Sequence, residues 1–365
     1  MSVVINKLDP RTSQARAVEL TDILVELPRN ISIIDALGLF EDVPVSQKTI
    51  EIQRAQYANH LVKDKNWDDK ADTLVNKPKM GFIHARIPNF ALRDAISPSD
   101  IDGVFSVNSV QEAAGLEQVM NVRVSKLDTM NSSLDLTQDV AKMQLLTSGT
   151  VYAPEGTLAT SYGDTIDFYQ EFGITRQTID LKLSGASDPR VSVSNLVRKM
   201  REALRNSPSK GSYRQLVVLC GSDFFDVVLT NPFATDAVKY FQQDLNKLLL
   251  GVPETAPGYG PDFRSIQAWG VVFIDAGTGG YDAADGTFVP WIAADEAIAV
   301  PTGVRGMFKS FHAPANKFSS VNKTSKGRYA FETINEEDDQ IKLTVEHNFM
   351  NACLYPGAIF TITKS

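Results

Sequence analysis

Apolar residues recur at helical spacing through residues 107–147, a segment with no proline and a single glycine, Gly115. The stripe consists of Leu116, Val119, Met120, Val124, Leu127, Met130 and Leu134. This spacing predicts a helix of roughly 60 Å, at about 1.5 Å per residue, with a bend near residues 131–133 where the stripe shifts. A stripe that contains methionines is most simply a core-facing surface. The length is unusual for a compact enzyme domain.

A second pattern predicts a protruding hairpin. Residues 45–53 and 79–87 each alternate between apolar and polar side chains, as strands do. Residues 63–79 carry five lysines and four aspartates, a density of charge that cannot be buried. We therefore expect the tip to be solvated or to touch another chain. Because an isolated hairpin is only marginally stable, we also expect it to lean on a neighbouring subunit and not on its own core.

The remaining patterns predict a mixed chain. An N-terminal arm with one short helix at 15–27 precedes an amphipathic element that ends near Gly38, and residues 165–172 and 178–183 resemble paired strands. An α/β block follows. Its predicted elements are a helix at 193–204, a strand at 215–220, a helix from Gly221 to 229 with Ser222 as its N-cap, a helix at 233–250, and strands at 269–274 and 297–300. Two strands, at 341–345 and 358–363, close the chain.

Composition narrows the class of protein. With 365 residues, 43% hydrophobic and 22% charged, the chain can bury a sizeable core, which excludes disordered and fibrous proteins. Its apolar runs are too short to cross a membrane, and residues 1–16 lack the apolar region of a secretory signal. The net charge of −8 argues against coating nucleic acid through overall charge.

The sequence offers little catalytic or metal-binding chemistry. The glycine-rich residues 277–286 lack the P-loop lysine, the dinucleotide spacing and the calcium-ligand ladder, so a surface turn is the simpler interpretation. Ser222 follows a strand, as a nucleophile would, but no histidine lies in its block. Cys353 is close in sequence to His347 and Asn351, which is not how thiol-protease sites are built. Cys220 and Cys353 both fall in apolar stretches typical of a core. We therefore expect no enzyme activity, no cofactor and no metal.

Charge, in contrast, is segregated along the chain. A basic group at 198–214 lacks the interleaved aromatics of a nucleic-acid surface, and a solvated helix face or a contact with an acidic neighbour is the simpler interpretation. Residues 297–331 contain six basic residues and no acidic one, whereas residues 332–339 contain five acidic residues and no basic one. Such blocks suit contacts between copies of one protein, in which the basic segment of one chain contacts the acidic segment of the next.

The order of these elements resembles the major capsid protein of tailed bacteriophages, the lambda-like major head protein (capsid E family) with the Hong Kong 97 fold. The resemblance is carried by Lys77-Pro78-Lys79 leading through residues 83–88, the long helix before Thr147-Ser148-Gly149, Phe288-Val289-Pro290 leading to residues 302–306, and the closing residues 348–360. It extends from about Asp35 to the end of the chain. No single motif is diagnostic, and the order and spacing carry the weight.

The resemblance implies an α+β capsid fold with five segments. These are an N-terminal arm (1–40), an extended loop over a neighbouring subunit (41–105), a peripheral domain with the spine helix (106–190), an axial domain at the capsomer centre (191–300) and C-terminal strands of the peripheral domain (301–365). Some capsids of this fold form lysine–asparagine cross-links between subunits. Loop lysines and the asparagines Asn348 and Asn351 are present, but the lambda-like branch is not known for this chemistry and we expect none.

The implied function is self-assembly into pentamers and hexamers of an icosahedral shell around double-stranded DNA, within the virion and, during assembly, in the host cytoplasm. The implied partners are other copies, scaffold, portal and decoration proteins, and packaged DNA through weak non-specific contact, with no membrane. An encapsulin-like compartment shell, or an α/β binding protein or enzyme, remains an alternative. We expect subunit contacts at Lys63, Lys65, Trp67, Asp68, Asp69, Lys70, Lys77, Lys79, Arg305, Lys309, Lys317, Lys323, Lys326, Arg328, Glu336, Glu337, Asp338 and Asp339.

Overall fold

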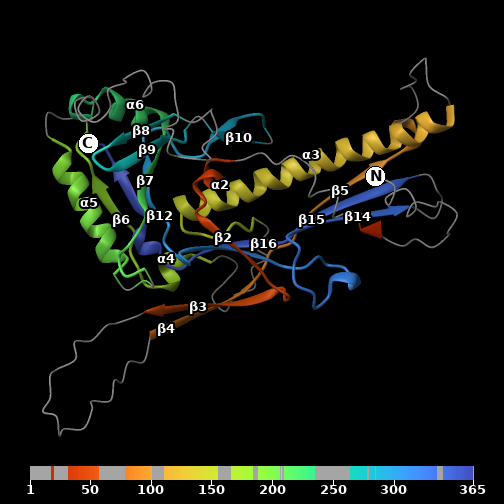
Figure 1. Cartoon of the computed structure of the whole chain (residues 1–365), viewed down its shortest axis with the longest axis horizontal. Helices are drawn as coiled ribbons and strands as arrows, with labels where there is room; N and C mark the ends of the chain where they lie inside the picture. Colours follow the sequence, from red (N-terminus) through yellow and green to blue (C-terminus); the bar gives the residue numbers. More distant parts are fainter. Residues whose placement is uncertain are drawn as a thin grey trace, which may run out of the picture.

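The computed structural model describes residues 18–19, 32–56, 79–100, 111–154, 166–183, 188–205, 207, 209–234, 264–277, 279–283, 285–334 and 340–364. The described part of the chain is elongated. A long helix, α3 (Gln111–Thr147), runs from a six-stranded sheet at one end along a four-stranded sheet to the other end (Figure 1). At about 1.5 Å per residue, its 37 residues span roughly 55 Å.

The six-stranded sheet holds most of the main core. In sheet order its strands are β6 (Gln177–Asp180), β17 (Phe360–Thr363), β12 (Ala297–Thr302), β7 (Gln215–Cys220), β9 (Val271–Asp275) and β8 (Ser265–Ala268). The β6–β17 and β7–β9 pairs are parallel, and the other pairs are antiparallel. Both faces of the central strands are covered, which explains why their sequences are continuously apolar and do not alternate. Helix α5 (Arg190–Ala203) contacts β6, and α6 (Ser222–Thr230) contacts β9.

The four-stranded sheet packs against the first part of α3 and has a separate core. Its strands are β1 (Val18–Glu19), β14 (Arg328–Ile334), β15 (Ile341–His347) and β5 (Phe90–Ile96), all antiparallel. Leu127, Met130 and Leu134 of α3 are buried against apolar side chains of β14 and β15. The last turns of α3 belong to the main core, through Leu145 and Leu146. The helix therefore joins two cores.

A three-stranded sheet and several short elements complete the body. The strands are β16 (Phe349–Cys353), β13 (Phe308–His312) and β2 (Phe40–Pro44), with β13 and β2 parallel. The short helix α2 (Ile33–Leu37) precedes β2; Ser32 caps its start, and Gly38 ends it in the left-handed conformation. The other elements are the single-turn helix α4 (Phe168–Glu171), the hairpin of β10 (Gly280–Asp282) and β11 (Phe288–Pro290), and the 3-10 turns η2 (Pro98–Asp100), η3 (Phe318–Ser320) and η4 (Pro356–Ala358).

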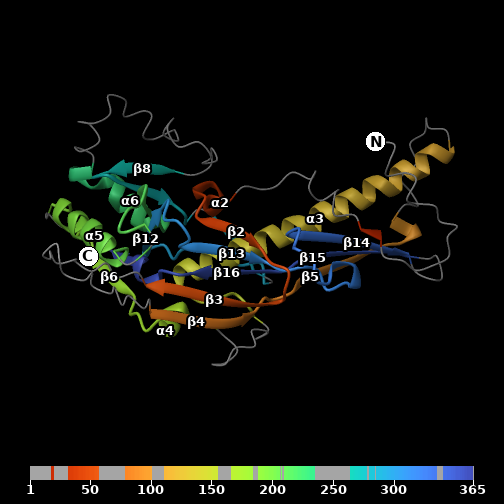
Figure 2. The same cartoon turned by 60° about the horizontal axis from the view of Figure 1, so that its bottom comes forward.

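The predicted hairpin is present as β3 (Thr49–Gln56) and β4 (Lys79–Arg86), paired antiparallel from Thr49 opposite Arg86 to Gln56 opposite Lys79. It lies below the sheets of the body (Figures 1 and 2). Ile52, Ile83 and Ala85 are buried in the main core. The base of the hairpin thus packs on its own chain, unlike the expectation, and residues 57–78, which include the charged tip, lie outside the described residues.

Several sequence-based predictions are confirmed and others are wrong in detail. The strand at 215–220 is β7, and the helices at 193–204 and 222–229 are α5 and α6. The predicted strand at 165–172 is wrong, because Asp167 Oδ1 accepts the backbone N–H of Tyr169 and starts the single turn of α4. Gly221, and not Ser222, is the N-cap of α6. The bend predicted near 131–133 is not seen as a break, since α3 is one continuous helix there. The helix predicted at 233–250 lies outside the described residues beyond Ala234.

Candidate assembly surfaces

Ionic contacts fix α3 to the four-stranded sheet in the interior of the molecule. Arg123 on α3 donates from Nη2 to Glu332 Oε1 on β14 at 2.8 Å, and both side chains are 5% exposed or less. Burial raises the pKa of Glu332, and the neighbouring Arg123 partly offsets this effect. Glu332 Oε2 and Arg123 Nε have no hydrogen-bond partner among the described residues. This pair is therefore a single, imperfectly satisfied contact.

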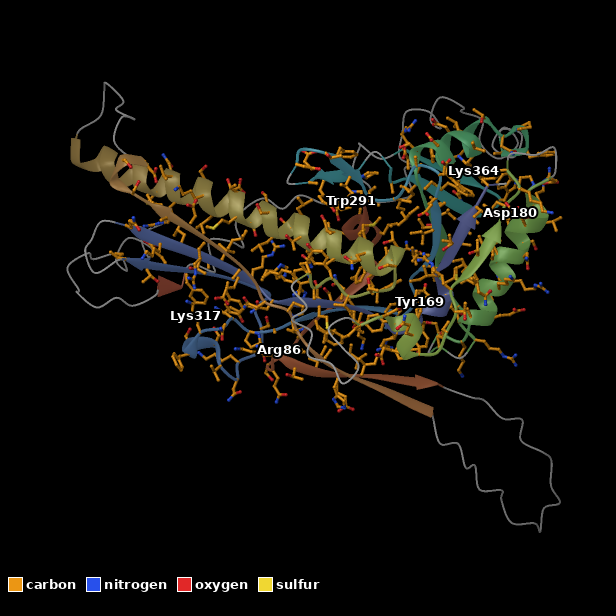
Figure 3. The ribbon with its side chains drawn as sticks, turned by 180° about the vertical axis from the view of Figure 1, so that it is seen from behind. Arg86, Tyr169, Asp180, Trp291, Lys317 and Lys364 are labelled. Atoms are coloured by element: carbon orange, nitrogen blue, oxygen red, sulfur yellow. The ribbon has the colours of Figure 1, made fainter. Side chains whose placement is uncertain are left out.

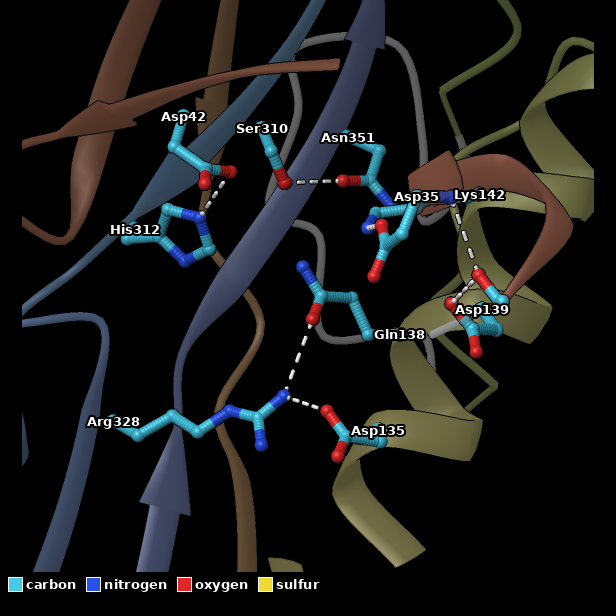
Figure 4. A network of polar contacts seen from close by, with 11 residues as sticks. Asp35, Asp42, Asp135, Gln138, Asp139, Lys142, Ser310, His312, Arg328 and Asn351 are labelled. Atoms are coloured by element: carbon cyan, nitrogen blue, oxygen red, sulfur yellow. Dashed lines mark hydrogen bonds and ion pairs between the residues drawn. The ribbon is translucent and has the colours of Figure 1, made fainter. Parts of the chain in front are cut away.

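A second buried group lies about two to four turns further along α3 than Arg123. Arg328, the first residue of β14, donates to Asn131. It also donates to Asp135 and, at 3.3 Å, to Gln138 Oε1 (Figure 4). Asn131, Asp135 and Gln138 are all nearly inaccessible to solvent. These polar side chains interrupt the apolar stripe of α3, which explains the shift that the sequence shows near 131–133.

The end of α3 holds helix α2 through polar contacts. The Lys142 ammonium donates to Asp35 Oδ1 at 2.5 Å, and Ser32 Oγ donates to Asp139 Oδ1 at 2.9 Å (Figure 4). Burial raises the pKa of Asp139 to about 6; the Ser32 hydrogen bond opposes that shift, and the negative charge of Asp35 adds to it. The connection from the N-terminal segment to β2 is thus fixed to the long helix.

The two asparagines considered for a cross-link are buried inside the chain. Asn351 Oδ1 accepts from Ser310 Oγ at 2.6 Å, and Asn348 Nδ2 donates to the Pro314 carbonyl at 3.0 Å. Each is 4% exposed or less. His312, beside them, contacts Asp42 Oδ1 through Nε2 at 3.1 Å (Figure 4). Neither side-chain amide is accessible to a second subunit in this conformation of the chain.

The predicted contact residues fall into three groups. The loop residues Lys63, Lys65, Trp67, Asp68, Asp69, Lys70 and Lys77 and the acidic Glu336, Glu337, Asp338 and Asp339 lie outside the described residues. Lys79 begins β4. The basic residues of 305–328 differ in how far they are exposed and in whether they contact their own chain.

Arg305, Lys323 and Lys326 are exposed, Lys309 is half-buried on β13, and Lys317 places its ammonium 5.3 Å from the centre of the Phe331 ring. Figure 3 shows Lys317 at the side of the body near the base of the hairpin, where Arg86 lies. Arg328 is engaged within the chain, as described above. No pattern in the sequence distinguishes the basic residues that form contacts inside the chain from those on its surface.

Sequence reasoning also missed Arg123, Glu332, Lys142 and Asp139 as structural charges. The available signal was the position of Arg123 on the helical stripe, four residues before Leu127. A charge at an apolar position of a long helix indicates a buried partner, but its partner lies 209 residues away in sequence.

Catalytic chemistry finds little support in the described part of the chain. Both cysteines are buried and neither forms a disulfide, and burial raises the pKa of the Cys220 thiol. Among the described residues, no group of three or more histidine, cysteine, aspartate or glutamate side chains is arranged to hold a metal ion. Similarly, none of the described helices combines the length and apolar character that a membrane span needs.

Known proteins match nearly the whole chain. The model of the family "Phage major capsid protein E" matches residues 16–364. The chain is 26% identical over 342 residues to the major capsid protein of Pseudomonas phage KPP10, covering 93% of this chain and 94% of that protein. It is 22% identical to the major capsid protein of Salmonella phage Felix O1, covering 94% and 95%.

A solved structure agrees with these sequence matches. A crystal structure described as a prophage capsid protein of E. coli CFT073 superposes with a TM-score of 0.62 at 11% identity, covering 96% of this chain and 100% of that one. This likeness supports the fold, which is the α+β capsid fold of the Hong Kong 97 type. On the family match, which covers all but the first 15 residues and the last, the chain belongs to the phage major capsid protein E family.

Proposed function

We propose that this chain assembles with copies of itself into pentamers and hexamers that close an icosahedral shell around double-stranded phage DNA. Membership of the capsid family supports this proposal. The observation that carries it is the β3–β4 hairpin below the sheets, whose two strands are joined by a segment rich in lysine and aspartate (Figure 1). A hairpin in which residues 63–79 carry five lysines and four aspartates suits contact with a neighbouring subunit better than it suits a monomeric protein.

The five segments expected from the sequence become a proposal about capsid domains, with two adjustments. β5 (Phe90–Ile96) pairs with β15 in the four-stranded sheet, so the extended loop is better confined to about 45–87. β6 pairs with β17 in the six-stranded sheet, which suggests that the axial domain draws strands from 106–190 and 301–365 as well as from 191–300.

The acidic block Glu336–Asp339 is proposed to meet basic residues of 305–328 on a neighbouring subunit. The exposed Arg305, Lys323 and Lys326 are the strongest candidates, because Arg328 is engaged in its own chain. Exposed pairs contribute about 0–1 kcal/mol each, so single substitutions should change little. Changing all four acidic residues to Asn or Gln should lower shell stability and flatten its salt dependence. An unchanged salt response would contradict the pairing.

The proposed role is structural and not enzymatic. The proposed surroundings are the virion and, during assembly, the host cytoplasm. Scaffold, portal and decoration proteins are proposed partners, and packaged DNA is proposed to touch the shell weakly because the subunit carries a net charge of −8.

Electron microscopy and sedimentation of the purified protein test this function. We expect capsomers or closed shells with five-fold and six-fold positions. Particles from infected cells should enclose nuclease-resistant double-stranded DNA, whereas a cargo-protein shell without DNA would support the encapsulin-like alternative. Small uniform oligomers under all assembly conditions would contradict the proposal. On a denaturing gel we expect single subunit bands, and a covalent ladder would show that the subunits are cross-linked.

A further inference from the structure

One surface of the six-stranded sheet region has more positive charge than its own chain neutralises. Arg198, Arg201, Arg205 and Lys210 line an open depression of about 420 Å³ along α5 and the turn that follows it. All four side chains are exposed. Glu202 is the single acidic residue in the lining, which leaves this basic face with a net charge of about three.

The basic face has no ionic partner among the described residues. Arg198 donates only to Asn195 Oδ1, at 3.1 Å, and no ion pair joins Arg201, Arg205 or Lys210 to a described carboxylate. Arg198 and Arg201 are three residues apart on α5 and so lie on one side of the helix, and Arg205 follows in the turn after it, beside the same depression. Like charges at this spacing destabilise a helix unless an anion lies near them. The face is thus suited to an anionic partner.

A group of exposed acidic residues lies elsewhere on the same sheet, and we call it the acidic face. Asp223, Asp226, Asp295 and Glu296 are exposed around the start of α6. Backbone hydrogen bonds from Gly221 N to Glu296 O, at 2.8 Å, and from Phe224 N to Ala294 O, at 3.0 Å, hold the two segments together. Arg264 and Lys364 neutralise Asp226 and Asp295 in part, whereas no ion pair is found for Asp223 or Glu296 among the described residues.

The two faces cannot neutralise each other within one subunit. Arg214 and the turn containing Lys210 precede β7, whereas α6 and Glu296 adjoin its other end. The six residues of β7 span roughly 20 Å. The helices also differ in place: α5 contacts the edge strand β6, and α6 contacts β9, four strands away (Figure 1).

We propose that the basic face of α5 binds the acidic face at the start of α6 of a second copy of this chain, head to tail. The inference rests on the proposed function, since a ring of identical subunits requires two different, complementary faces on each subunit. Five or six such contacts close the ring. Because the contact is between exposed charges, it sets which faces meet and is weakened by salt, whose screening length is about 8 Å at physiological ionic strength.

A second copy is a better occupant than nucleic acid for two reasons. The subunit carries a net charge of −8, which opposes approach to a polyanion. In addition, the complementary acidic face is present on the same sheet, whereas the lining of the depression contains no aromatic side chain on which a base could stack.

Charge exchange in the full-length chain tests the contact. The first variant, Arg198→Glu with Arg201→Glu, makes both faces negative; the second, Asp223→Lys with Glu296→Lys, makes both positive. Each alone should form no rings, while circular dichroism and the melting temperature stay close to the parent because the side chains are exposed. A chain that carries all four substitutions has the parent's net charge and exchanged faces, and should assemble again.

Mixing the two double variants gives a sharper result. Their rings must alternate between the two chains, so we expect even-numbered rings such as hexamers and no pentamers, visible by native mass spectrometry. Normal assembly of either double variant alone would overturn the proposal, as would failure of the folded fourfold variant to assemble. If either variant is unfolded, Arg198→Gln with Arg201→Gln should still lower the salt concentration at which rings dissociate, and an unchanged value would overturn the proposal.

The same experiment separates this contact from the function on which it rests. If the parent chain forms no capsomers or shells, the proposed function fails. If the parent and both double variants form shells equally well, only the contact fails. Variants that assemble normally but lose salt-dependent DNA binding would show that the basic face binds nucleic acid and would overturn the proposed partner.

Discussion

The buried pair between Arg123 and Glu332 gives a quantitative test of how the long helix is held. Removing the carboxylate by Glu332→Ala leaves the Arg123 guanidinium, whose side chain is 5% exposed, inside the protein without its counter-ion. Breaking a buried pair in this way costs about 3–5 kcal/mol. The backbone pairing of Glu332 with Val18 does not require the side chain, so the loss comes from the charge and the space left behind.

The loss of stability expected for Glu332→Ala is large enough to measure by thermal unfolding of the unassembled subunit. Unfolding entropies of about 2.1 cal/mol/K per residue give about 0.8 kcal/mol/K for 365 residues that melt together. A loss of about 4 kcal/mol therefore lowers the melting temperature by about 5 °C. As a control, Asp94→Asn alters a more exposed contact, with Lys126 at 3.5 Å, and should cost no more than about 1 kcal/mol.

Replacing both Arg123 and Glu332 shows whether the loss of stability comes from an unpaired buried charge or from any change at these two positions. Arg123→Met with Glu332→Leu removes both charges and keeps apolar volume beside Leu127 and Leu343. Because Arg123 Nε and Glu332 Oε2 already lack partners among the described residues, we expect the double variant to match or exceed the parent in stability. If Glu332→Ala melts like the parent, or if the double variant is as unstable as the single one, the buried charge is not the cause and the reasoning is wrong.

Three further predictions concern other parts of the chain. The pKa of Asp139 is about 6 in the folded state against an ordinary 3.8, so this group makes the subunit less stable as pH rises from about 4 to about 6 and adds no change above. Asp139→Asn keeps the acceptor for Ser32, and should raise the free energy of unfolding at pH 7 by about 1–3 kcal/mol and flatten that pH window in urea titrations; an unchanged pH profile would contradict this. Gly221→Ala should prevent native folding or cost several degrees in melting temperature, because its Cβ would lie 2.1 Å from the Ala293 carbonyl oxygen, and a variant with the parent's melting curve would refute that packing. Deleting residues 63–72 should leave a folded, soluble subunit that forms no stable shells by electron microscopy, and normal shells would count against a role for the tip in assembly.

The elements that local sequence could predict are those whose pattern has a single physical meaning. Residues 215–220 form an uninterrupted apolar run between polar turns, and β7 has those bounds. Alternation at 45–53 and 79–87 likewise identified the hairpin, although β3 begins at Thr49 and continues to Gln56. At 165–172 alternation was misleading, because one capping carboxylate, Asp167, outweighed the strand pattern of a short segment.

The assembly surfaces were harder to predict than the fold. Sequence showed that charges are segregated, but a basic residue used inside the chain looks the same as one left on the surface. Arg328 and Asp135 are 193 residues apart, and Arg123 and Glu332 are 209 apart. A charge on the apolar stripe of α3 indicates that a buried partner exists, but nothing local identifies that partner, because the pairing depends on the position of α3 against β14. The basic group at 198–214, in contrast, could be noted from sequence, and the structure adds that four of its side chains, Arg198, Arg201, Arg205 and Lys210, line one depression.

The buried ion pairs of α3 leave the negative excess of the chain unchanged. Each of them joins one base to one acid: Arg123 to Glu332, Arg328 to Asp135, and Lys142 to Asp35. Pairs of this kind remove equal numbers of positive and negative charges, so the net charge of −8 is carried by the rest of the chain. Copies of such a subunit repel one another at long range, and assembly then requires local faces of opposite sign. The unpaired arginines of α5 supply one such face against that background, which is why reversing two of them is expected to abolish ring formation while leaving the fold intact.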